Sequence, residues 1–305
     1  MTTALERQEG RAELNGWHTW YRVVGNLGAA IAAGRRPLVT LHGGPGASHD
    51  YLIRLERLAE SGRAIVFYDQ LGGGRSTHLS DKDASFWTVE LFLEELDNLL
   101  AHLGIAEGYH LLGQSWGGML GAEHAVRRPA GLKSLVIADS PASMKLWVEE
   151  ADRLRQALPP AVQATLLQHE AAGTTSSPDY AKAVRVFYER HLCRALPWPA
   201  ELDRAFALME EDPTVYHTMN GPSEFHVVGS LKSWSIIDRL DRVAAPTLII
   251  SGRHDEATPA TVQPYADRIA KARWEIFEDS SHSPHIEETE RYLALVAGFL
   301  AEHDD

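Results

Sequence analysis

Short apolar runs with the length of buried strands recur over about the first 140 residues, and several of them end in loops that contain glycine. The segment 88–103 instead places its apolar residues at helical spacing. The expected strands in this part of the chain cover residues 17–24, 37–41, 64–68, 109–112 and 132–137. Strands and helices that alternate in this way predict an α/β fold, with a mostly parallel sheet and helices on both of its faces.

The pattern changes between about residues 142 and 236, where alanine, leucine, glutamate and arginine are frequent and prolines interrupt the chain. This stretch has no convincing strand pattern, so we expect a helical insertion. Strand-like runs return at 246–250 and 274–277, before a final expected helix. The sequence therefore predicts a catalytic core formed by residues 1–141 and 237–305, with a helical cap over residues 142–236.

Composition restricts the possible partners. The net charge is −13 and there is no long basic run, which argues against a nucleic-acid surface. No apolar run approaches the roughly 20 residues that span a bilayer, and the first residues do not resemble a signal peptide, so we expect a cytoplasmic protein without membrane contact. Cys193 is the only cysteine, which excludes an intramolecular disulfide and a thiolate cluster. We expect no metal and no cofactor; the oligomeric state stays open.

One pentapeptide carries the first chemical signal. Gly113-Gln114-Ser115-Trp116-Gly117 lies between an expected strand and an expected helix. A serine with glycine two places to either side at such a junction is typical of a nucleophile elbow, a tight turn that exposes the serine hydroxyl. The pattern predicts Ser115 as a nucleophile.

A serine hydroxyl needs a base, which is usually a histidine oriented by a carboxylate. Asp255 and His282 each follow an expected strand, in the chain order that this type of sheet uses. Both therefore belong to the sheet edge at which Ser115 is expected. His285 is a competing base and Asp139 a competing acid.

Acyl transfer also needs hydrogen-bond donors for the developing oxyanion. We expect one donor to be the backbone N–H of Trp116, directly after the nucleophile. The glycine-rich loop that follows the strand 37–41 can supply the second, and Gly44 is the expected donor. Whether the bulk of Trp116 also restricts the substrate is left open.

Together these motifs resemble those of the proline iminopeptidases, which are α/β-hydrolase serine aminopeptidases, and especially the tricorn-interacting aminopeptidases and amino-acid amidases. The resemblance covers nearly the whole chain and is carried by residues 42–46, 67–76, 113–118, 216–225 and 251–259. It implies a capped α/β-hydrolase fold. It also implies a catalytic triad of Ser115, Asp255 and His282, with Gly44 and Trp116 as oxyanion donors.

The resemblance also implies roles for two glutamates. Glu224 in the cap and Glu256 beside Asp255 fall where relatives hold the substrate's free α-ammonium group. A charge-assisted hydrogen bond to each carboxylate contributes roughly 1.5–3 kcal/mol. Tyr216, in the same cap motif, is expected to be a wall of the substrate pocket.

The leading hypothesis is hydrolysis of the amide bond after an N-terminal residue with a free α-amino group, with a small peptide or an amino-acid amide as the substrate. An esterase or lactonase, and an acyltransferase to an amine, are alternatives on the same scaffold. A non-catalytic binding module is a further alternative, although such proteins commonly lose a triad member, and all three are present here.

Overall fold

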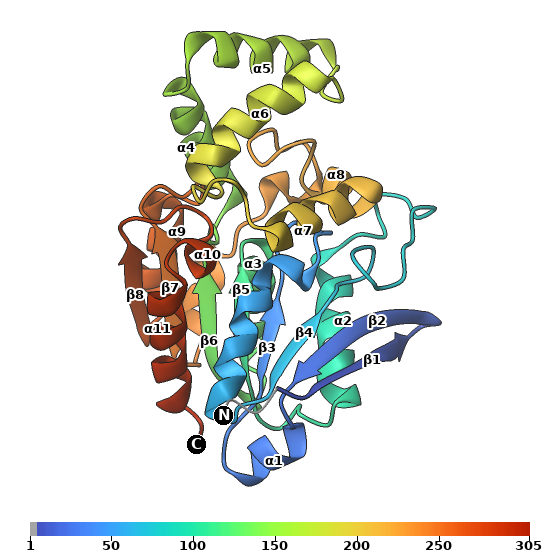
Figure 1. Ribbon diagram of the computed structural model, residues 1–305, viewed down its shortest axis with the longest axis vertical. Coiled ribbons are helices and arrows are strands. Elements are labelled where there is room, and N and C mark those ends of the chain that lie inside the picture. Colours follow the sequence, from blue (N-terminus) through green and yellow to red (C-terminus); the bar gives the residue numbers. More distant parts are fainter. Residues whose placement is uncertain (1–4) are drawn as a thin grey trace.

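The computed structural model describes residues 5–305 and contains one eight-stranded sheet (Figure 1). The strands are β1 (Arg7–Leu14), β2 (Trp17–Val24), β3 (Leu38–Leu41), β4 (Ile65–Tyr68), β5 (Tyr109–Gln114), β6 (Leu132–Ala138), β7 (Thr247–Gly252) and β8 (Ala272–Phe277). Their order in the sheet is β1-β2-β4-β3-β5-β6-β7-β8. The pairs from β4 to β8 are parallel, whereas β2 is antiparallel to both β1 and β4. The carboxyl ends of the parallel strands therefore share one edge.

Helices cover both faces of this sheet. One face carries α2 (Val89–His102), α3 (Trp116–Val126) and α9 (Pro259–Arg268), and the other carries η1 (His49–Ser61) and α11 (Thr289–Ala301). Successive residues of a strand point to opposite faces of the sheet. Val39 and Leu41 therefore pack in the apolar cluster on the side of α2, α3 and α9, and Leu38 packs in the cluster on the side of η1 and α11. Burial on both faces explains why these strands are continuous apolar runs in the sequence.

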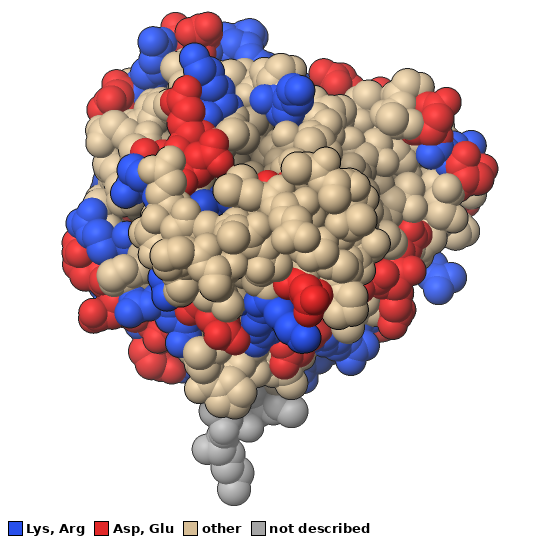
Figure 2. Space-filling view, turned by 90° about the horizontal axis from the view of Figure 1, so that it is seen from above, with Lys and Arg blue, Asp and Glu red and all other residues tan. Residues whose placement is uncertain are grey.

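Residues 142–236, called the cap from here on, lie beyond the carboxyl edge of the sheet (Figure 1). Their helices are α4 (Met144–Gln156), α5 (Pro160–Ala172), α6 (Pro178–His191), α7 (Ala200–Glu211), α8 (Thr214–Met219) and η2 (Ser230–Ser233). Helices α5 and α6 lie farthest from the sheet, whereas α7 packs against η1. Seen from the cap side, basic and acidic side chains interleave around the margin of the molecule (Figure 2).

The α/β-hydrolase fold class is confirmed, and each expected strand is present with its ends shifted by no more than two residues. Neither β1 nor η1 was predicted from the sequence. β1 forms the sheet edge and buries only Ala12, so it lacks the apolar alternation that marks a strand. Four further helices were also not predicted: α1 (Leu27–Ala32), η3 (Ile237–Arg242), α9 (Pro259–Arg268) and α10 (Pro284–Glu287). Within residues 5–305, no helix combines the length and apolar character needed to cross a membrane.

Candidate active site

Ser115 lies in the turn between β5 and α3, in a backbone conformation that side chains rarely adopt. Its φ is 56° and its ψ is −124°, which is strained for any residue other than glycine. The flanking glycines have a steric cause: a Cβ on Gly113 would lie 2.0 Å from the Gly117 carbonyl oxygen, and one on Gly117 would lie 2.0 Å from the Leu41 oxygen. The turn can therefore be this tight only with glycine at both positions, and it places Ser115 at the carboxyl edge of the sheet.

Asp255 and His282 come from the loops after β7 and β8, and their side chains are hydrogen bonded. His282 Nδ1 lies 2.6 Å from Asp255 Oδ1, which also accepts the Ala257 N–H at 2.7 Å. Burial lowers the pKa of His282, but the charge and hydrogen bond of Asp255 help to raise it above its ordinary value. Because His282 and Ser115 line one cavity, a hydroxyl, an imidazole and a carboxylate come together at this edge.

The two competing residues have other partners. His285 Nε2 lies 3.2 Å from the Tyr51 carbonyl oxygen, and burial lowers the pKa of this imidazole to about 3. Asp139 Oδ1 accepts the Gly252 N–H at 3.1 Å, and its carboxyl group contacts that of Asp255. Neither arrangement pairs Ser115 with a second base or gives His282 a second acid.

Two backbone donors lie beside Ser115. Gly44 has a φ of +105°, and a Cβ there would lie 2.8 Å from the backbone nitrogens of Gly46 and Ala47. Within residues 5–305, neither the Gly44 N–H nor the Trp116 N–H has an acceptor in the protein. Both residues line a small cavity that also contains Ser115. The two N–H groups are thus available to a substrate oxygen.

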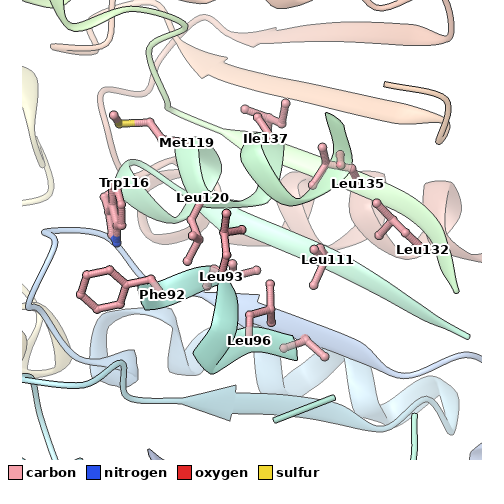
Figure 3. Close-up of a cluster of buried hydrophobic side chains, with 14 of the residues drawn as sticks. Phe92, Leu93, Leu96, Leu111, Trp116, Met119, Leu120, Leu132, Leu135 and Ile137 are labelled. Atoms are coloured by element: carbon pink, nitrogen blue, oxygen red, sulfur yellow. The ribbon is translucent and has the colours of Figure 1, made fainter. Parts of the chain in front are cut away.

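The side chain of Trp116 packs mainly into the core, although Trp116 also lines the small cavity beside Ser115. Its ring lies next to Phe92 of α2, with 5.6 Å between the ring centroids (Figure 3). Its Nε1 donates to Gln70 Oε1 at 2.8 Å, and the residue is only 2% exposed. The indole therefore does not extend across the cavity that holds His282.

This main cavity, of about 50 Å³, has Glu224 and Glu256 in its wall together with Ser115 and His282. Glu256 is fully buried, and neither of its carboxylate oxygens has a hydrogen-bond partner among the described residues. Burial raises the pKa of Glu256 well above its ordinary value, and the charges of Glu224 and Asp255 raise it further. Burial also raises the pKa of Glu224. A buried carboxylate without a hydrogen-bond partner is costly, so Glu256 favours a cationic ligand, and Glu224 faces the same cavity.

Three aromatic residues of the cap hold Glu224. The Tyr216 hydroxyl donates to Glu224 Oε1 at 2.7 Å, and Trp147 Nε1 donates to the Glu224 carbonyl oxygen at 2.6 Å. The Tyr188 hydroxyl accepts the Glu224 N–H at 3.3 Å. Tyr216, which was expected to be a pocket wall, contacts Glu224 and is not among the residues that line the main cavity. It borders a second groove of about 710 Å³ in the cap, which shares Phe206 and Met209 with the main cavity. Its place in the motif could not show which face of α8 is turned toward Ser115.

Two polar residues that the sequence analysis did not assign connect the loops of the site. The Tyr51 hydroxyl accepts the Gly43 N–H at 2.7 Å and donates to Gln114 Oε1 at 2.6 Å. Gln114 Nε2 in turn donates to the His282 carbonyl oxygen at 2.9 Å. Gln114 could have been recognised as a site residue from the sequence, because it lies within the elbow motif. Tyr51 belongs to η1, which was not predicted.

A backbone atom of the cap joins two of these loops. The carbonyl oxygen of His191, the last residue of α6, accepts the Glu256 N–H at 3.1 Å and the His282 N–H at 3.2 Å. The cap is thereby hydrogen bonded to the loops that carry Glu256 and His282.

The sheet, the elbow and the loops at its carboxyl edge define an α/β-hydrolase with an inserted helical region. A family model described as the alpha/beta hydrolase fold matches residues 36–289. Among residues 5–305, no group of three His, Cys, Asp or Glu side chains is arranged to hold a metal ion.

Sequence relatives narrow this class. The chain is 36% identical over 304 residues to a proline iminopeptidase from Lactobacillus helveticus, a match that covers 99% of this chain and all of the relative. A proline iminopeptidase from Saccharolobus solfataricus is also 36% identical, over 97% of this chain and 93% of the relative. The chain therefore belongs to the proline iminopeptidase family of α/β-hydrolase enzymes.

Solved structures support the same family assignment. The proline iminopeptidase of Mycobacterium smegmatis is 51% identical with a TM-score of 0.89, and VinJ is 54% identical with a TM-score of 0.94. Each comparison covers 97% of this chain and 99% of the other. More distant structures, such as an enol-lactonase from Burkholderia xenovorans at 22% identity, share the fold alone.

Proposed function

We propose that this enzyme is a serine aminopeptidase, which hydrolyses the amide bond after an N-terminal residue that has a free α-amino group. The observation that carries the proposal is Glu256, whose two carboxylate oxygens are buried beside Ser115 and His282 without a hydrogen-bond donor among residues 5–305. The nearest ionisable nitrogen, His282 Nε2, lies 3.9 Å from Glu256 Oε1. Glu224 faces the same cavity from the cap. An α-ammonium group bound between the two carboxylates would satisfy them, and it would place the adjacent carbonyl carbon near the serine.

In the proposed reaction, Ser115 Oγ attacks the carbonyl carbon while His282 Nε2 takes the hydroxyl proton. The N–H groups of Gly44 and Trp116 donate to the oxyanion that forms. The C–N bond then breaks, and His282 gives its proton to the leaving amine. Water cleaves the acyl-enzyme by the same steps and releases the amino acid. Throughout, Asp255 accepts the His282 Nδ1–H, as the 2.6 Å contact supports.

A second space beside Ser115 suggests which first residues fit. It measures only about 10 Å³ and is lined largely by apolar side chains, including Met119, Met144, Trp147 and Leu231. It reaches both Gly44 and Glu224, so a side chain placed there leaves the ammonium and the carbonyl oxygen within reach of their partners. We therefore propose a small apolar first residue, such as proline or alanine, and expect slower turnover of phenylalanine substrates.

The alternatives explain the site less well. An esterase or lactonase needs no cation site, and would leave the buried carboxylate of Glu256 without a function. An acyltransferase shares every group up to the acyl-enzyme, so only product analysis with an added amine acceptor separates it from a hydrolase. A binding module needs no strained serine beside a carboxylate-bound imidazole.

The test compares free and N-acetylated amino-acid anilides on the wild type and on Glu224→Gln. We expect kcat/KM for free-amine substrates to fall about tenfold to a hundredfold, mainly through KM, because one charge-assisted hydrogen bond is lost. The rate at which a fluorophosphonate labels Ser115 should be unchanged. Glu170→Gln is the matched control, since Glu170 is a cap glutamate that binds Arg155 outside the main cavity.

Two results would contradict the proposal. One is equal turnover of acetylated and free substrates by the wild type, which would remove the ammonium from recognition. The other is equal loss of fluorophosphonate labelling and peptidase activity in Glu224→Gln, which would give Glu224 a general structural role.

A further inference from the structure

Two neighbouring carboxyl groups follow the paired strands β6 and β7, and each has one oxygen without a donor among the described residues. Asp139, at the end of β6, and Asp255 are both buried, with 0% and 1% exposure. Each Oδ1 atom accepts hydrogen bonds: Asp139 Oδ1 accepts the Gly252 N–H, and Asp255 Oδ1 accepts the Ala257 N–H and the N–H of His282. The two Oδ2 atoms have no partner among the described residues, although the carboxyl groups lie within hydrogen-bonding range of each other.

A single proton between the two groups satisfies both atoms. Two carboxylates in contact repel each other, whereas a carboxylic acid donates a hydrogen bond to a neighbouring carboxylate. Hydrogen-bond donors stabilise a carboxylate charge, and Asp255 has two of them, one being the imidazole of His282, whereas Asp139 has one. The negative charge is therefore more stable on Asp255. We propose that Asp139 is a neutral carboxylic acid that donates its proton to Asp255 Oδ2, and so acts as a positioning residue for the base His282.

The surroundings of Asp139 agree with this protonation state. Burial raises its pKa well above the ordinary value, and the charges of Asp255 and Glu287 raise it further. The other titratable groups that face it are the phenols of Tyr51 from η1 and Tyr292 from α11. None of these groups can supply a positive charge. The backbone of Asp139 has a φ of 51°, which aspartate tolerates better than most residues.

The proposed role follows from geometry. A donor on Oδ2 fixes the plane of the Asp255 carboxylate, so that Oδ1 faces His282 Nδ1. Asp139 is not among the residues that line the main cavity, so it acts through Asp255. The inference rests on the proposed function, in which His282 is the base, but not on the identity of the substrate.

The test measures the rate at which a fluorophosphonate inactivates the wild type, Asp139→Asn and Asp139→Gly between pH 5 and 9. This readout depends on the base but not on the ammonium site, so it stays informative if no peptide is turned over. Asparagine tolerates the same backbone and presents N–H where the acid presents O–H. Glycine also tolerates the backbone but removes the donor. Thermal melts show that each variant is folded.

We expect Asp139→Asn to inactivate within about threefold of the wild type, with the acidic limb of the pH profile unmoved, because no charge is lost. Asp139→Gly should inactivate about tenfold to a hundredfold more slowly, because Asp255 loses a donor. Two results would overturn the proposal. A downward move of the acidic limb by about one pH unit in Asp139→Asn would show that Asp139 is ionised. Equal loss in both folded variants would show that the donated proton is not what matters.

Discussion

The two sides of the main cavity are built differently. On the core side, backbone geometry places the reacting groups: the elbow holds Ser115, and the loop after β3 leaves the Gly44 N–H without an acceptor among the described residues. On the cap side, side chains do this work, since Tyr216 and Trp147 hold Glu224. Backbone geometry that only glycine permits leaves a short motif in the sequence, whereas a side-chain contact between distant helices does not. Chemistry is therefore easier to infer from this chain than selectivity.

The largest expected effect tests the core side. Ser115→Ala should reduce kcat about 10⁵-fold to 10⁶-fold, because it removes the nucleophile while leaving substrate binding intact. Turnover of a free-amine anilide measures the loss, and KM should change little. A residual rate within a hundredfold of the wild type, in enzyme purified free of contaminating hydrolases, would exclude Ser115 as the nucleophile.

The next effect concerns the backbone that holds this serine. Gly113→Ala should lower the free energy of unfolding by more than about 3 kcal/mol, because the added Cβ meets backbone atoms that cannot move aside. The obstructing atom is the Gly117 carbonyl oxygen, at 2.0 Å. Urea unfolding measures the change. Gly298→Ala in α11 is the matched control: its Cβ meets nothing within 4 Å, and it should stabilise the helix by about 0.5–1 kcal/mol.

A third test asks whether the ammonium site is costly without its ligand. The pKa of Glu256 is raised on folding, so the wild type loses stability as pH rises from the ordinary glutamate pKa to the folded one. Glu256→Gln removes this loss and should melt a few degrees higher at pH 8, with a smaller gain at pH 5. A gain independent of pH would separate the stabilisation from the carboxylate charge.

The smallest expected effect tests a side-chain contact on the cap side. Tyr216→Phe removes the hydroxyl that donates to Glu224 Oε1. A hydrogen bond to a carboxylate of this kind contributes about 1–2 kcal/mol, so KM for free-amine substrates should rise roughly fivefold to thirtyfold with kcat nearly unchanged. Steady-state kinetics on anilides measures the effect. A fall in kcat alone would move Tyr216 from substrate binding to the chemical step.

The difference between the core side, built by backbone geometry, and the cap side, built by side-chain contacts, also determines what could be predicted from the sequence. The elbow, the carboxylate and the histidine follow expected strands, so their meeting at one edge followed from topology. Glu224 and Glu256 drew attention only through a family resemblance, because an isolated glutamate is usually solvated. Tyr51 and β1 were not predicted. Tyr51 lies in η1, where Leu52, Leu55 and Leu58 do recur at helical spacing, so that helix carried a signal that was not used. β1 exposes most of its residues at a sheet edge and carried no such signal. Contacts between separate chain segments depend on packing, which periodicity does not describe.

The carbonyl oxygen of His191 has a consequence for engineering. Helices of the cap are natural targets for exchange between relatives when a new substrate is wanted. The atom that ties the cap to the loops of Glu256 and His282 belongs to the main chain, so any residue at position 191 can supply it. A graft chosen by matching residue types can therefore align perfectly and still displace this acceptor. Chimeras of this enzyme should be designed on the position of that oxygen before the side chain at 191 is chosen, although the His191 ring adds a second contact, with Nδ1 2.9 Å from the His254 carbonyl oxygen.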